Sequence, residues 1–577
     1  MKQYMKYVKP YLPFFILAPI LMVVEVVGEV VMPKLLANII NEGIPNMDTG
    51  YIVRMGLMMA GMAILMMLGG VGGGFFSAKA SVNFAAALRK DAFTKVQQFS
   101  FANIDKFSTG SLVTRLTNDI TQLQNIINMA LKMAIRAPGM LIGALIMAIR
   151  LNASLAVVIA VVIPVLVIAL VLVMKTAFPR FQMMQKKLDR LNTNVQENLT
   201  NIRVVKSFVR EKEEYEKFSE ANGDLYDTSM SAFKVVIATM PIMTVAMNVT
   251  TLAVVWLAGN QILVGQMEIG DLTAFTTYVV QILISLMMTA MVILNSSRAV
   301  ASAKRISEIL NTEVDLTDET ASQKSAVVTT GHVEFRDVCF KYYKDHEEYV
   351  LDHISFTANP GEVVGIIGST GSGKTSLVQL IPRLYDCDEG EVLVDGINVK
   401  EYSLKHLREG VGMVLQKNVL FSGTIMDNLK WGDENATEEE IIAAADRAQA
   451  HQFISSFTEQ YETELGQGGV NVSGGQKQRL CIARALLKKP KILILDDSTS
   501  AVDTATEKRI REAFSQELKD TTKIIIAQRI SSVKEADRIL VIDEGKIVGE
   551  GTHEELIKNC EEYREICISQ EEKEADA

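Results

Sequence analysis

The chain has 577 residues, of which 49% are hydrophobic and 22% are charged, and its formal net charge is −10 at pH 7. This length allows several domains, and the apolar content exceeds that of an ordinary soluble enzyme, so the composition predicts that part of the chain lies in a membrane. The negative charge argues against a nucleic-acid-binding protein, because such proteins present basic surfaces to the phosphate backbone.

Methionine and cysteine divide the chain into two parts. Of the 28 Met residues, 26 lie at or before Met291, whereas all five Cys residues lie after residue 330. The Cys residues show no paired spacing and no C-x-x-C motif, which argues against disulfides and against a zinc site. The sequence therefore predicts two modules in series, with the second in a reducing cytosol.

Six segments of the first module are apolar enough to cross about 30 Å of hydrocarbon, which takes about 20 helical residues each. They lie near residues 11–35, 52–80, 129–150, 153–176, 235–262 and 272–296. The sequence therefore predicts an all-α, six-helix transmembrane domain over residues 1–310.

The Lys and Arg residues between these segments predict the orientation, because cytoplasmic loops are enriched in them. They precede the first segment and fill two stretches, after the second and after the fourth: Lys2, Lys6, Lys9, Arg89, Lys90, Lys95, Lys106, Arg115, Lys186, Lys187, Arg190, Arg203, Lys206 and Arg210. Both termini are then cytoplasmic in a multi-pass plasma-membrane protein surrounded by lipid. The short outer loops and the lack of an organelle presequence favour a bacterial membrane.

The two basic stretches are too long for turns, and both continue the helical periodicity of the spans. Within them, residues 103–110 are rich in turn formers and residues 205–218 form a short charged amphipathic segment. Either segment could dock on a soluble domain, and a solvated loop is the alternative.

Polar residues inside the spans are candidates for a substrate site. Glu25 and Glu29 lie four residues apart and therefore share one helical face. Charged groups are costly in lipid, so these carboxylates are expected to face protein or water, as a site for cationic substrates or as part of a wet outer vestibule. Arg136 is similarly ambiguous. The Met clusters at 55–67 and 287–291 are compatible with an adaptable cavity, although such residues more often pack helices or face lipid.

The second module alternates short β-rich runs with amphipathic helices, after a polar linker at 311–326. This pattern is typical of an α/β domain, here over residues 327–577. An apolar run at 363–367 leads into GSTGSGKT at 368–375, and a helix is expected at 376–384. Strand, glycine-rich loop and helix form the setting of a phosphate-binding P-loop.

A second buried strand, at 492–496, ends in Asp496, which is placed to hold Mg²⁺. Ser473, Gly474, Gly475 and Gln476 lie just upstream. With these motifs the chain resembles the ATP-binding cassette exporters over nearly its whole length. The resemblance implies a half-transporter with one six-helix membrane domain and one nucleotide-binding domain, and it makes ATP and Mg²⁺ the expected cofactors.

Site residues follow from the resemblance by position. Tyr342 corresponds to the aromatic residue that stacks on adenine, with Tyr343 as an alternative, and Gln416 to the residue that senses Mg²⁺ and the membrane domain. Segments 103–110 and 205–218 correspond to coupling helices. The implied ATP-binding residues are Tyr342, Gly368, Ser369, Thr370, Gly371, Ser372, Gly373, Lys374, Thr375, Ser376, Gln416, Ser473, Gly474, Gly475, Gln476 and Asp503. The implied Mg²⁺ ligands are Thr375, Gln416 and Asp496.

Two catalytic positions depart from the family pattern. Asp497 stands where the family has Glu, and Gln528 stands where it has His. The shorter carboxylate retracts by about 1.5 Å, whereas attack geometry tolerates errors of only about 1 Å. The Gln amide cannot carry the positive charge that His can. The pocket is therefore expected to bind ATP and to hydrolyse it poorly, while the signature loop differs mildly, with Val472 in place of Leu.

This asymmetry predicts one subunit of a heterodimeric, multidrug-type exporter, whose non-identical partner half-transporter supplies the intact catalytic residues. Two alternatives remain open: a homodimeric exporter with slow ATPase activity, and an ATP-gated, non-transporting membrane regulator. The sequence does not identify the exported small or amphipathic substrate.

Overall fold

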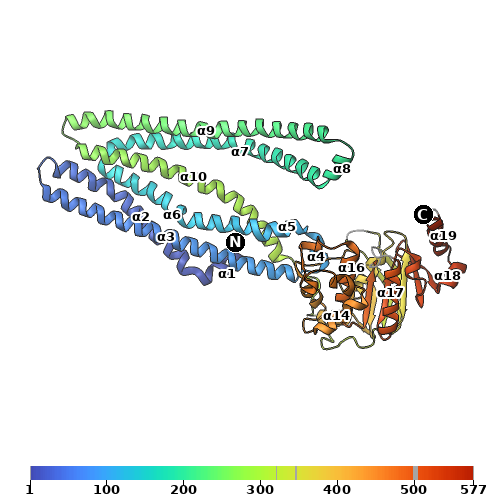
Figure 1. Cartoon of the computed structure of the whole chain (residues 1–577). Helices are drawn as coiled ribbons and strands as arrows, with labels where there is room; N and C mark the ends of the chain where they lie inside the picture. Colours follow the sequence, from blue (N-terminus) through green and yellow to red (C-terminus); the bar gives the residue numbers. More distant parts are fainter. Residues whose placement is uncertain (1, 320, 345–346, 498–503, 576–577) are drawn as a thin grey trace. The chain divides into compact units, whose positions relative to one another are not determined.

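The computed structural model describes residues 2–319, 321–344, 347–497 and 504–575. The chain forms two compact units (Figure 1). Unit 1 consists of Met1–Val96 and Gly110–Asn311, and unit 2 consists of Gln97–Thr109 and Thr312–Ala577. A short piece of the N-terminal half thus belongs to the compact unit formed by the C-terminal half.

Unit 1 is entirely helical. Its principal helices are α1 (Met5–Val8), α2 (Leu12–Asn38), α3 (Thr49–Gln97), α5 (Thr109–Thr114), the π-helix η4 (Arg115–Asp119), α6 (Ile120–Leu151), α7 (Ala153–Thr200), α8 (Ile202–Ser207), α9 (Glu211–Leu263) and α10 (Ile269–Asn311). Among the described residues, six helical stretches are long and apolar enough to span a membrane. The predicted six-helix fold is confirmed, and several helices extend well beyond the length that a bilayer requires.

The helices of unit 1 form a core and an arm. Helices α2, α6 and α10 pack against one another, whereas α7 packs mainly against α9, and this pair parts from the core towards the end that carries α8 (Figure 1). Asn152 alone separates α6 from α7. Its extended backbone breaks the helix, and its side-chain oxygen caps α7 by accepting from Ser154 N and Leu155 N, both at 3.1 Å. Its amide also donates to Gln261 Oε1 at 2.5 Å, which fastens the two arm helices together.

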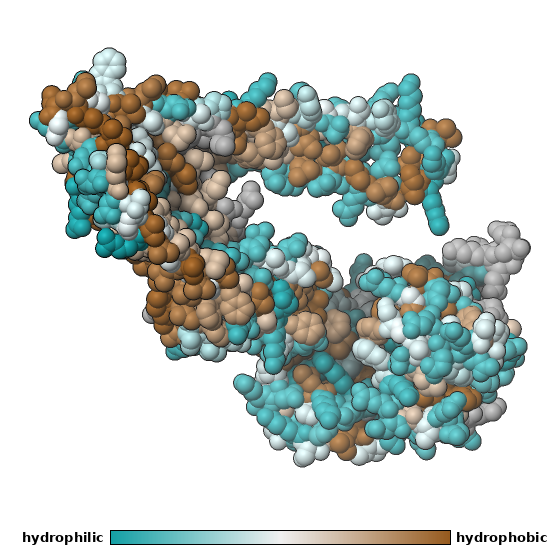
Figure 2. All heavy atoms as spheres, turned by 60° about the vertical axis from the view of Figure 1, so that its left-hand side comes forward, coloured by the Kyte–Doolittle hydropathy of each residue, from teal (hydrophilic) through white to brown (hydrophobic). Residues whose placement is uncertain are grey.

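The surface of unit 1 carries many apolar side chains, which appear brown in Figure 2. Along α7 the exposed residues include Val161, Val165 and Leu172, which follow one another at helical spacing. Exposed apolar surface of this extent is stable only against lipid or another protein. The distribution therefore agrees with a helical unit placed in a bilayer.

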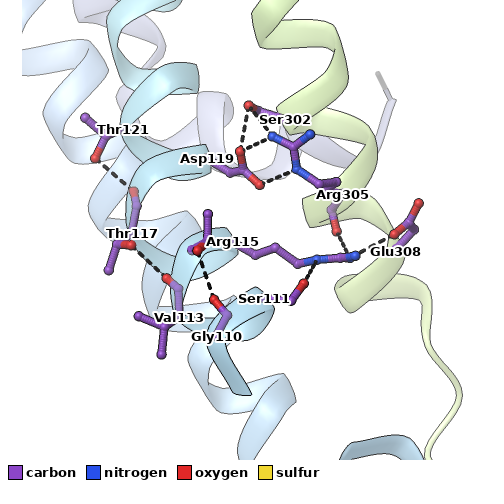
Figure 3. A network of polar contacts seen from close by, with 11 residues as sticks. Gly110, Ser111, Val113, Arg115, Thr117, Asp119, Thr121, Ser302, Arg305 and Glu308 are labelled. Carbon is purple, nitrogen blue, oxygen red and sulfur yellow. Dashed lines mark hydrogen bonds and ion pairs between the residues drawn. The ribbon is translucent and has the colours of Figure 1, made fainter. Parts of the chain in front are cut away.

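A buried polar network joins η4 to the last turns of α10 (Figure 3). The Asp119 carboxylate is almost fully buried and accepts from Ser302 Oγ at 2.8 Å and from Arg305 Nε at 2.7 Å. Arg115 donates to the carbonyl of Arg305 and to Glu308 Oε2, both at 2.8 Å. A buried carboxylate is tolerated when it is paired and hydrogen-bonded, so this network fixes α10 against the chain that enters α6.

Unit 2 is an α/β domain with two main sheets. The larger sheet has six strands in the order β12-β11-β3-β10-β9-β6 and is parallel except for β12. The smaller sheet has four antiparallel strands in the order β2-β1-β4-β5. The strands are β1 (Val333–Phe340), β2 (Leu351–Ala358), β3 (Val363–Gly368), β4 (Glu389–Val394), β5 (Ile397–Asn398), β6 (Val411–Val414), β7 (Gly423–Thr424), β8 (Glu464–Leu465), β9 (Ile492–Asp496), β10 (Thr522–Ile526), β11 (Arg538–Asp543) and β12 (Lys546–Gly551). The helices are α4 (Phe101–Lys106), α11 (Lys374–Leu380), α12 (Leu404–Gly410), α13 (Ile425–Lys430), α14 (Glu438–Arg447), α15 (His451–Ser455), α16 (Gly474–Leu487), α17 (Thr504–Glu517), α18 (His553–Asn559) and α19 (Glu561–Ala575). Apolar side chains such as Ile366, Ile494 and Ile524 fill the core between sheets and helices. The predicted α/β class is confirmed.

Three local boundaries differ from the sequence prediction. The helix expected at 376–384 is α11, and it ends at Leu380 because Pro382 lacks the N–H that a longer helix would need. The turn-rich segment 103–110 holds the later part of helix α4 and the first residues of α5, and Ser100 and Asn103 start α4 with a reciprocal capping box. The charged segment 205–218 is divided between the end of α8 and the start of α9.

Candidate functional site

Four parallel strands of the large sheet end at one edge, where α/β sheets bind their ligands. In the register, Ile526 of β10 pairs with Ile366 of β3 and with Asp496 of β9, and Val414 of β6 pairs with Leu495 of β9. The segments that follow these strands therefore meet. They contain most of the sequence-predicted residues: the loop from Gly368, then Gln416, Asp496, Asp497 and Gln528. We call this edge the strand-end pocket.

The glycine-rich loop comes directly after β3, and its backbone lies very close to neighbouring segments of the chain. A Cβ atom at Gly368 would lie 1.9 Å from the carbonyl oxygen of Ile542, and one at Gly373 would lie 2.8 Å from that of Val350. Gly373 also has φ +98°, which favours glycine. Side chains other than hydrogen are thus excluded at both ends of the loop, and its backbone is open to a phosphate group.

Lys374 and Thr375 begin α11 inside this loop. The ammonium of Lys374 donates to the carbonyl of Ser369 at 2.6 Å and to that of Gly368 at 3.0 Å. Burial lowers the pKa of Lys374, and the carboxylates of Asp496 and Asp497 oppose this shift. Thr375 Oγ1 donates to Asp496 Oδ1 at 3.1 Å. A hydroxyl and a carboxylate beside an ammonium fit the needs of a magnesium nucleotide, whose phosphates are bound by Lys and whose metal takes oxygen ligands.

Asp497 lies next to this group and is held by two amides. Gln528 Nε2 donates to Asp497 Oδ2 at 2.7 Å, and Gln416 also donates to the carboxylate. The backbone of Asp497 has φ +47° and its N–H donates to the carbonyl of Ile526 at 3.0 Å. Burial raises the pKa of Asp497, while both hydrogen bonds oppose this shift. The two residues singled out as departures are therefore hydrogen-bonded to each other.

The aromatic residue Tyr342 lies beside α11. Its hydroxyl is 2.8 Å from Ser376 Oγ, and its ring meets those of Phe340 and Tyr385 edge to face, at centroid distances of 4.9 and 5.1 Å. Burial raises the pKa of the Tyr342 hydroxyl. The side chain of Tyr343 is more exposed than that of Tyr342, at 64% against 37%. The geometry favours Tyr342 over Tyr343 as an aromatic surface next to the loop.

The turn at Ser473 is separate from the strand-end pocket in sequence and is positioned by α16. Ser473 Oγ accepts from Gln476 N, and Gln476 Oε1 accepts from Ser473 N at 2.8 Å, so the two residues form a capping box. Helix α16 packs on α13, α14 and β6. Gly474 and Gly475 form its first turn and add no side chain there, so the N–H groups of this turn are accessible. The segment containing Asp503 lies outside the described residues.

Two comparisons with known proteins decide the family. Residues 15–287 match the ABC transporter transmembrane region, and residues 351–500 match the ABC transporter family. The ABC transporter ATP-binding protein YfiB of Bacillus subtilis (strain 168) is 40% identical over 99% of this chain and 98% of its own length. The chain belongs to the ABC transporter family.

Other ABC transporters share the same architecture. Rv1273c of Mycobacterium tuberculosis (strain ATCC 25618 / H37Rv) is 37% identical over 98% of this chain and 97% of its own. The Bacillus subtilis protein YgaD, which is named for multidrug export, is 32% identical over 98% of each chain. The solved structure of a bacterial Atm1-family ABC exporter with ATP bound superimposes with a TM-score of 0.75 at 25% identity, covering 96% of this chain and 98% of the other. This ABC transporter is therefore a half-transporter with an exporter fold, in which an ATPase domain drives transport.

The structure also reveals residues that the sequence reasoning missed. Gln570 of α19 donates to the carbonyl of Gln528 at 2.8 Å and accepts from the N–H of Ile530 at 2.9 Å, so it clips the backbone on both sides of Arg529. No local pattern marks this role, because the partners are 40 and 42 positions apart in the sequence.

Tyr385 is the second missed residue, and it connects α4 to the aromatic group. Its hydroxyl donates to Asp105 Oδ2 at 2.6 Å, its ring lies 6.0 Å from that of Phe101, and it contacts Tyr342. Helix α4 is further held by Asn103, whose amide donates to the carbonyl of Glu313 at 3.1 Å. A continuous set of contacts thus runs from α4 to Tyr342 and on to the loop.

Glu25, Glu29 and Arg136 of the membrane unit form one charged cluster. Arg136 Nη2 lies 2.5 Å from Glu29 Oε1 and 3.2 Å from Glu25 Oε1, and Gln281 donates to the backbone carbonyl of Glu29 at 2.9 Å. The sequence left Arg136 unassigned, and the structure makes it the partner of both carboxylates. Such pairing lowers the cost of burying charge between helices. The two Glu residues thus share one basic partner.

The methionine clusters are divided by the fold. On α3, Met58 and Met67 are more than half exposed, whereas Met66 lies close to Gly28 of α2. On α10, Met291 is 56% exposed. Only Met58, Met67 and Met291 of these side chains are exposed, and the other six are partly buried.

Proposed function

We propose that this chain is one subunit of a heterodimeric ABC exporter in which its own strand-end pocket binds ATP and hydrolyses it slowly. The observation that carries the proposal is the hydrogen bond between Asp497 and Gln528. It joins two residues that lack, respectively, the reach and the charge needed to activate water and to stabilise the transferred phosphate.

The hydrogen bond supports slow hydrolysis in a second way. The carboxylate of Asp497 is hydrogen-bonded to the amides of Gln528 and Gln416, neither of which can take up a proton. A positioned base typically accelerates a reaction by about 10²–10⁴, so a retracted carboxylate forfeits a large part of that factor. In contrast, Lys374, Thr375 and Asp496 retain the arrangement that binds a magnesium nucleotide. Binding and turnover are therefore separated in this pocket.

The intact signature turn supports a non-identical partner. ABC exporters act as dimers, and in the proposed assembly each ATP is held between one chain's phosphate loop and the other chain's signature turn. The capping box of Ser473 and Gln476 orders the first turn of the 14-residue helix α16 and leaves the N–H groups of Gly474 and Gly475 for a γ-phosphate. This chain then completes a productive site whose Glu and His come from the partner.

The arm of unit 1 supports a second subunit as well. At its tip, Phe208 and Val209 are more than 70% exposed and Tyr215 is 68% exposed. Apolar surface at the end of a helical pair calls for a protein partner. We assign α8 as a coupling helix for the second subunit and α4 as the coupling helix for this chain's own nucleotide domain, with both termini in the cytoplasm.

In the proposed cycle, ATP binding closes the two nucleotide domains and the coupling helices move with them. The membrane cavity then opens outward and releases a small or amphipathic substrate. Hydrolysis at the partner's site resets the cavity, while the nucleotide in this chain's pocket stays bound through several cycles.

The test is to purify the chain from its native membrane and to identify the subunit that copurifies. We expect a second half-transporter with Glu and His at the positions of Asp497 and Gln528, and ATPase activity only in the complex. A homodimer of this chain with ordinary ATPase activity would overturn the proposal. ATP-dependent accumulation of a dye in vesicles separates an exporter from an ATP-gated regulator.

A further inference from the structure

Cys339 differs from the other cysteines in its surroundings. Cys387, Cys481 and Cys560 lie inside the apolar clusters of unit 2, and Cys567 packs against one of them. Cys339 is completely buried, yet it belongs to none of the apolar clusters formed by the described residues. Its thiol therefore does not fill a gap in a hydrophobic core, which is the usual role of a buried free cysteine.

A β-bulge brings polar side chains to this thiol. Val338 of β1 pairs with Ile354 of β2, but Phe340 pairs with Leu351, so Cys339 alone faces two residues, Asp352 and His353. His353 has φ +53°, as expected of the extra residue in such a bulge. Its N–H donates to Cys339 Sγ at 3.3 Å. The bulge thus places a thiol, a carboxylate and an imidazole at one point on the sheet.

The three side chains have the spacing of a metal site. One ligand atom from each of Cys339, Asp352 and His353 can be chosen so that all lie within 4.8 Å of one another. Zn²⁺ binds S, N and O ligands at about 2.0–2.3 Å, which separates neighbouring ligand atoms by about 3.3–3.8 Å. Side-chain shifts of roughly 0.5 Å each would close the site, because each ligand is on a rotatable side chain.

Asp337 orients the imidazole from outside this triad. His353 Nδ1 lies 2.7 Å from Asp337 Oδ1, which leaves Nε2 directed towards Asp352 Oδ1 at 3.8 Å. A carboxylate on one ring nitrogen fixes the tautomer that presents a lone pair on the other. Lys546 Nζ contacts the second oxygen of Asp352 at 3.0 Å. Both supporting contacts hold the ligand atoms towards a common point.

The charge balance also calls for a cation. The thiol lies near the carboxylates of Asp337, Asp352 and Glu389, and Glu389 is its register partner on β4. A divalent ion would relieve the repulsion, and on binding it would release the thiol proton to solvent.

We propose that Cys339, Asp352 and His353 form a binding site for a transition-metal ion of the Zn²⁺ type, with Asp337 as its positioning residue and one open coordination position. Thiolate and imidazole select Zn²⁺, Co²⁺ and Cd²⁺ over Mg²⁺ and Ca²⁺, which prefer oxygen. The site is distinct from the strand-end pocket and does not depend on the heterodimer proposal. Cys339 lies three residues before Tyr342, so a bound ion would stiffen the strand β1 that leads to the Tyr342 ring.

The test uses the purified full chain, free of nucleotide, with Zn²⁺ counted by elemental analysis and Co²⁺ used as a spectroscopic probe. We expect the wild type to hold one Zn²⁺ ion more per chain than Cys339→Ser, and its Co²⁺ form to show a thiolate-to-metal charge-transfer band. His353→Asn should remove the extra ion and the band, because it removes the imidazole ligand. The variant should still fold, because Asn tolerates a positive φ and the position is exposed. Asp337→Asn should weaken binding by about 10–100-fold, the typical cost of losing such a support.

Cys481→Ser is the matched control, because it removes a buried thiol that lies in an apolar cluster beside Val419 and Arg484 and should leave the stoichiometry and the band unchanged. ATP binding, measured in parallel, shows that each variant is folded. Equal Zn²⁺ content in the wild type, Cys339→Ser and His353→Asn would overturn the proposal, as would a Co²⁺ form without a thiolate band.

Discussion

The strand-end pocket and the N-terminal turn of α16 contain the two kinds of ATP contact that an ABC nucleotide domain provides, and they differ in completeness. In the turn at Ser473, a reciprocal capping box orders the backbone that a phosphate would meet. In the pocket, the binding groups Lys374, Thr375 and Asp496 converge, but Asp497 is bonded to Gln528. The changes thus fall on the groups that activate water and not on those that bind the nucleotide. In the proposed dimer, the turn that would serve the other chain is therefore more complete than the pocket that this chain builds for itself.

The largest expected effect is that of Ser473→Ala on the ATPase activity of the assembled transporter. The substitution removes a contact at the productive site and unravels the first turn of α16, and losing one preorganised donor site costs about 10²–10³ in rate. Steady-state ATPase assays of the complex measure the loss. Ser403→Ala is the matched control, because Ser403 caps α12 in the same way, accepting from His406 N, away from the nucleotide.

Lys374→Ala sharpens the same contrast. It should weaken ATP binding in this chain's pocket while the complex retains part of its ATPase activity, because in the proposed heterodimer the productive phosphate loop belongs to the partner. Binding of a labelled ATP analogue and ATPase activity are measured together. If Lys374→Ala abolishes turnover more completely than Ser473→Ala, the productive site is the one built by this chain.

The double variant Asp497→Glu with Gln528→His restores the two family residues in the strand-end pocket and tests whether their loss limits hydrolysis there. It restores the length of the carboxylate and the charge of the imidazole, so turnover in this pocket should rise by about 10². The measurement requires a complex in which the partner's catalytic Glu is replaced by Gln, so that only this pocket can turn over. No rise would falsify the claim that these two residues limit the site.

Tyr342→Ala should produce a moderate loss of ATP affinity. Stacking of a base on an aromatic ring is worth about 1–3 kcal/mol, so the dissociation constant should increase by roughly 5–150-fold. Tyr342→Phe is the control, since it keeps the ring and removes only the hydroxyl contact to Ser376. Tyr343→Ala should leave the affinity unchanged, and the reverse result would reassign the stacking residue.

The smallest effect is expected for Tyr385→Phe. The variant keeps the rings in contact and loses one hydrogen bond to Asp105, which costs about 1–2 kcal/mol because its acceptor is charged. Basal ATPase activity should change little, whereas its stimulation by a transported dye should fall several-fold. Equal stimulation in both proteins would show that α4 transmits no signal through Tyr385.

The sequence predicted the parts of the fold that are local in origin. The apolar run at 492–496 became β9, and the run at 363–367 became β3, because a buried parallel strand is continuously apolar between turn formers. The six apolar segments likewise became the membrane helices. Each of these features is determined by a short stretch of neighbouring residues.

Long-range contacts could not be predicted. The pairing of Arg136 with Glu25 and Glu29, the bond from Tyr385 to Asp105 and the clip by Gln570 each join residues from separate elements. A bulge also brings His353 of β2 beside Cys339 of β1, which the spacing of the cysteines alone does not indicate. Register shifts of this kind leave no periodic signal in the sequence.

The clip by Gln570 has a practical consequence for handling the protein. Because its amide bridges the backbone on both sides of Arg529, a reporter or affinity handle fused behind α19 would pull on the segment that contains Gln528. Turnover rates obtained with such fusions would then differ from those of protein labelled at the other terminus. Fluorophores attached near α19 would, for the same reason, report on nucleotide occupancy.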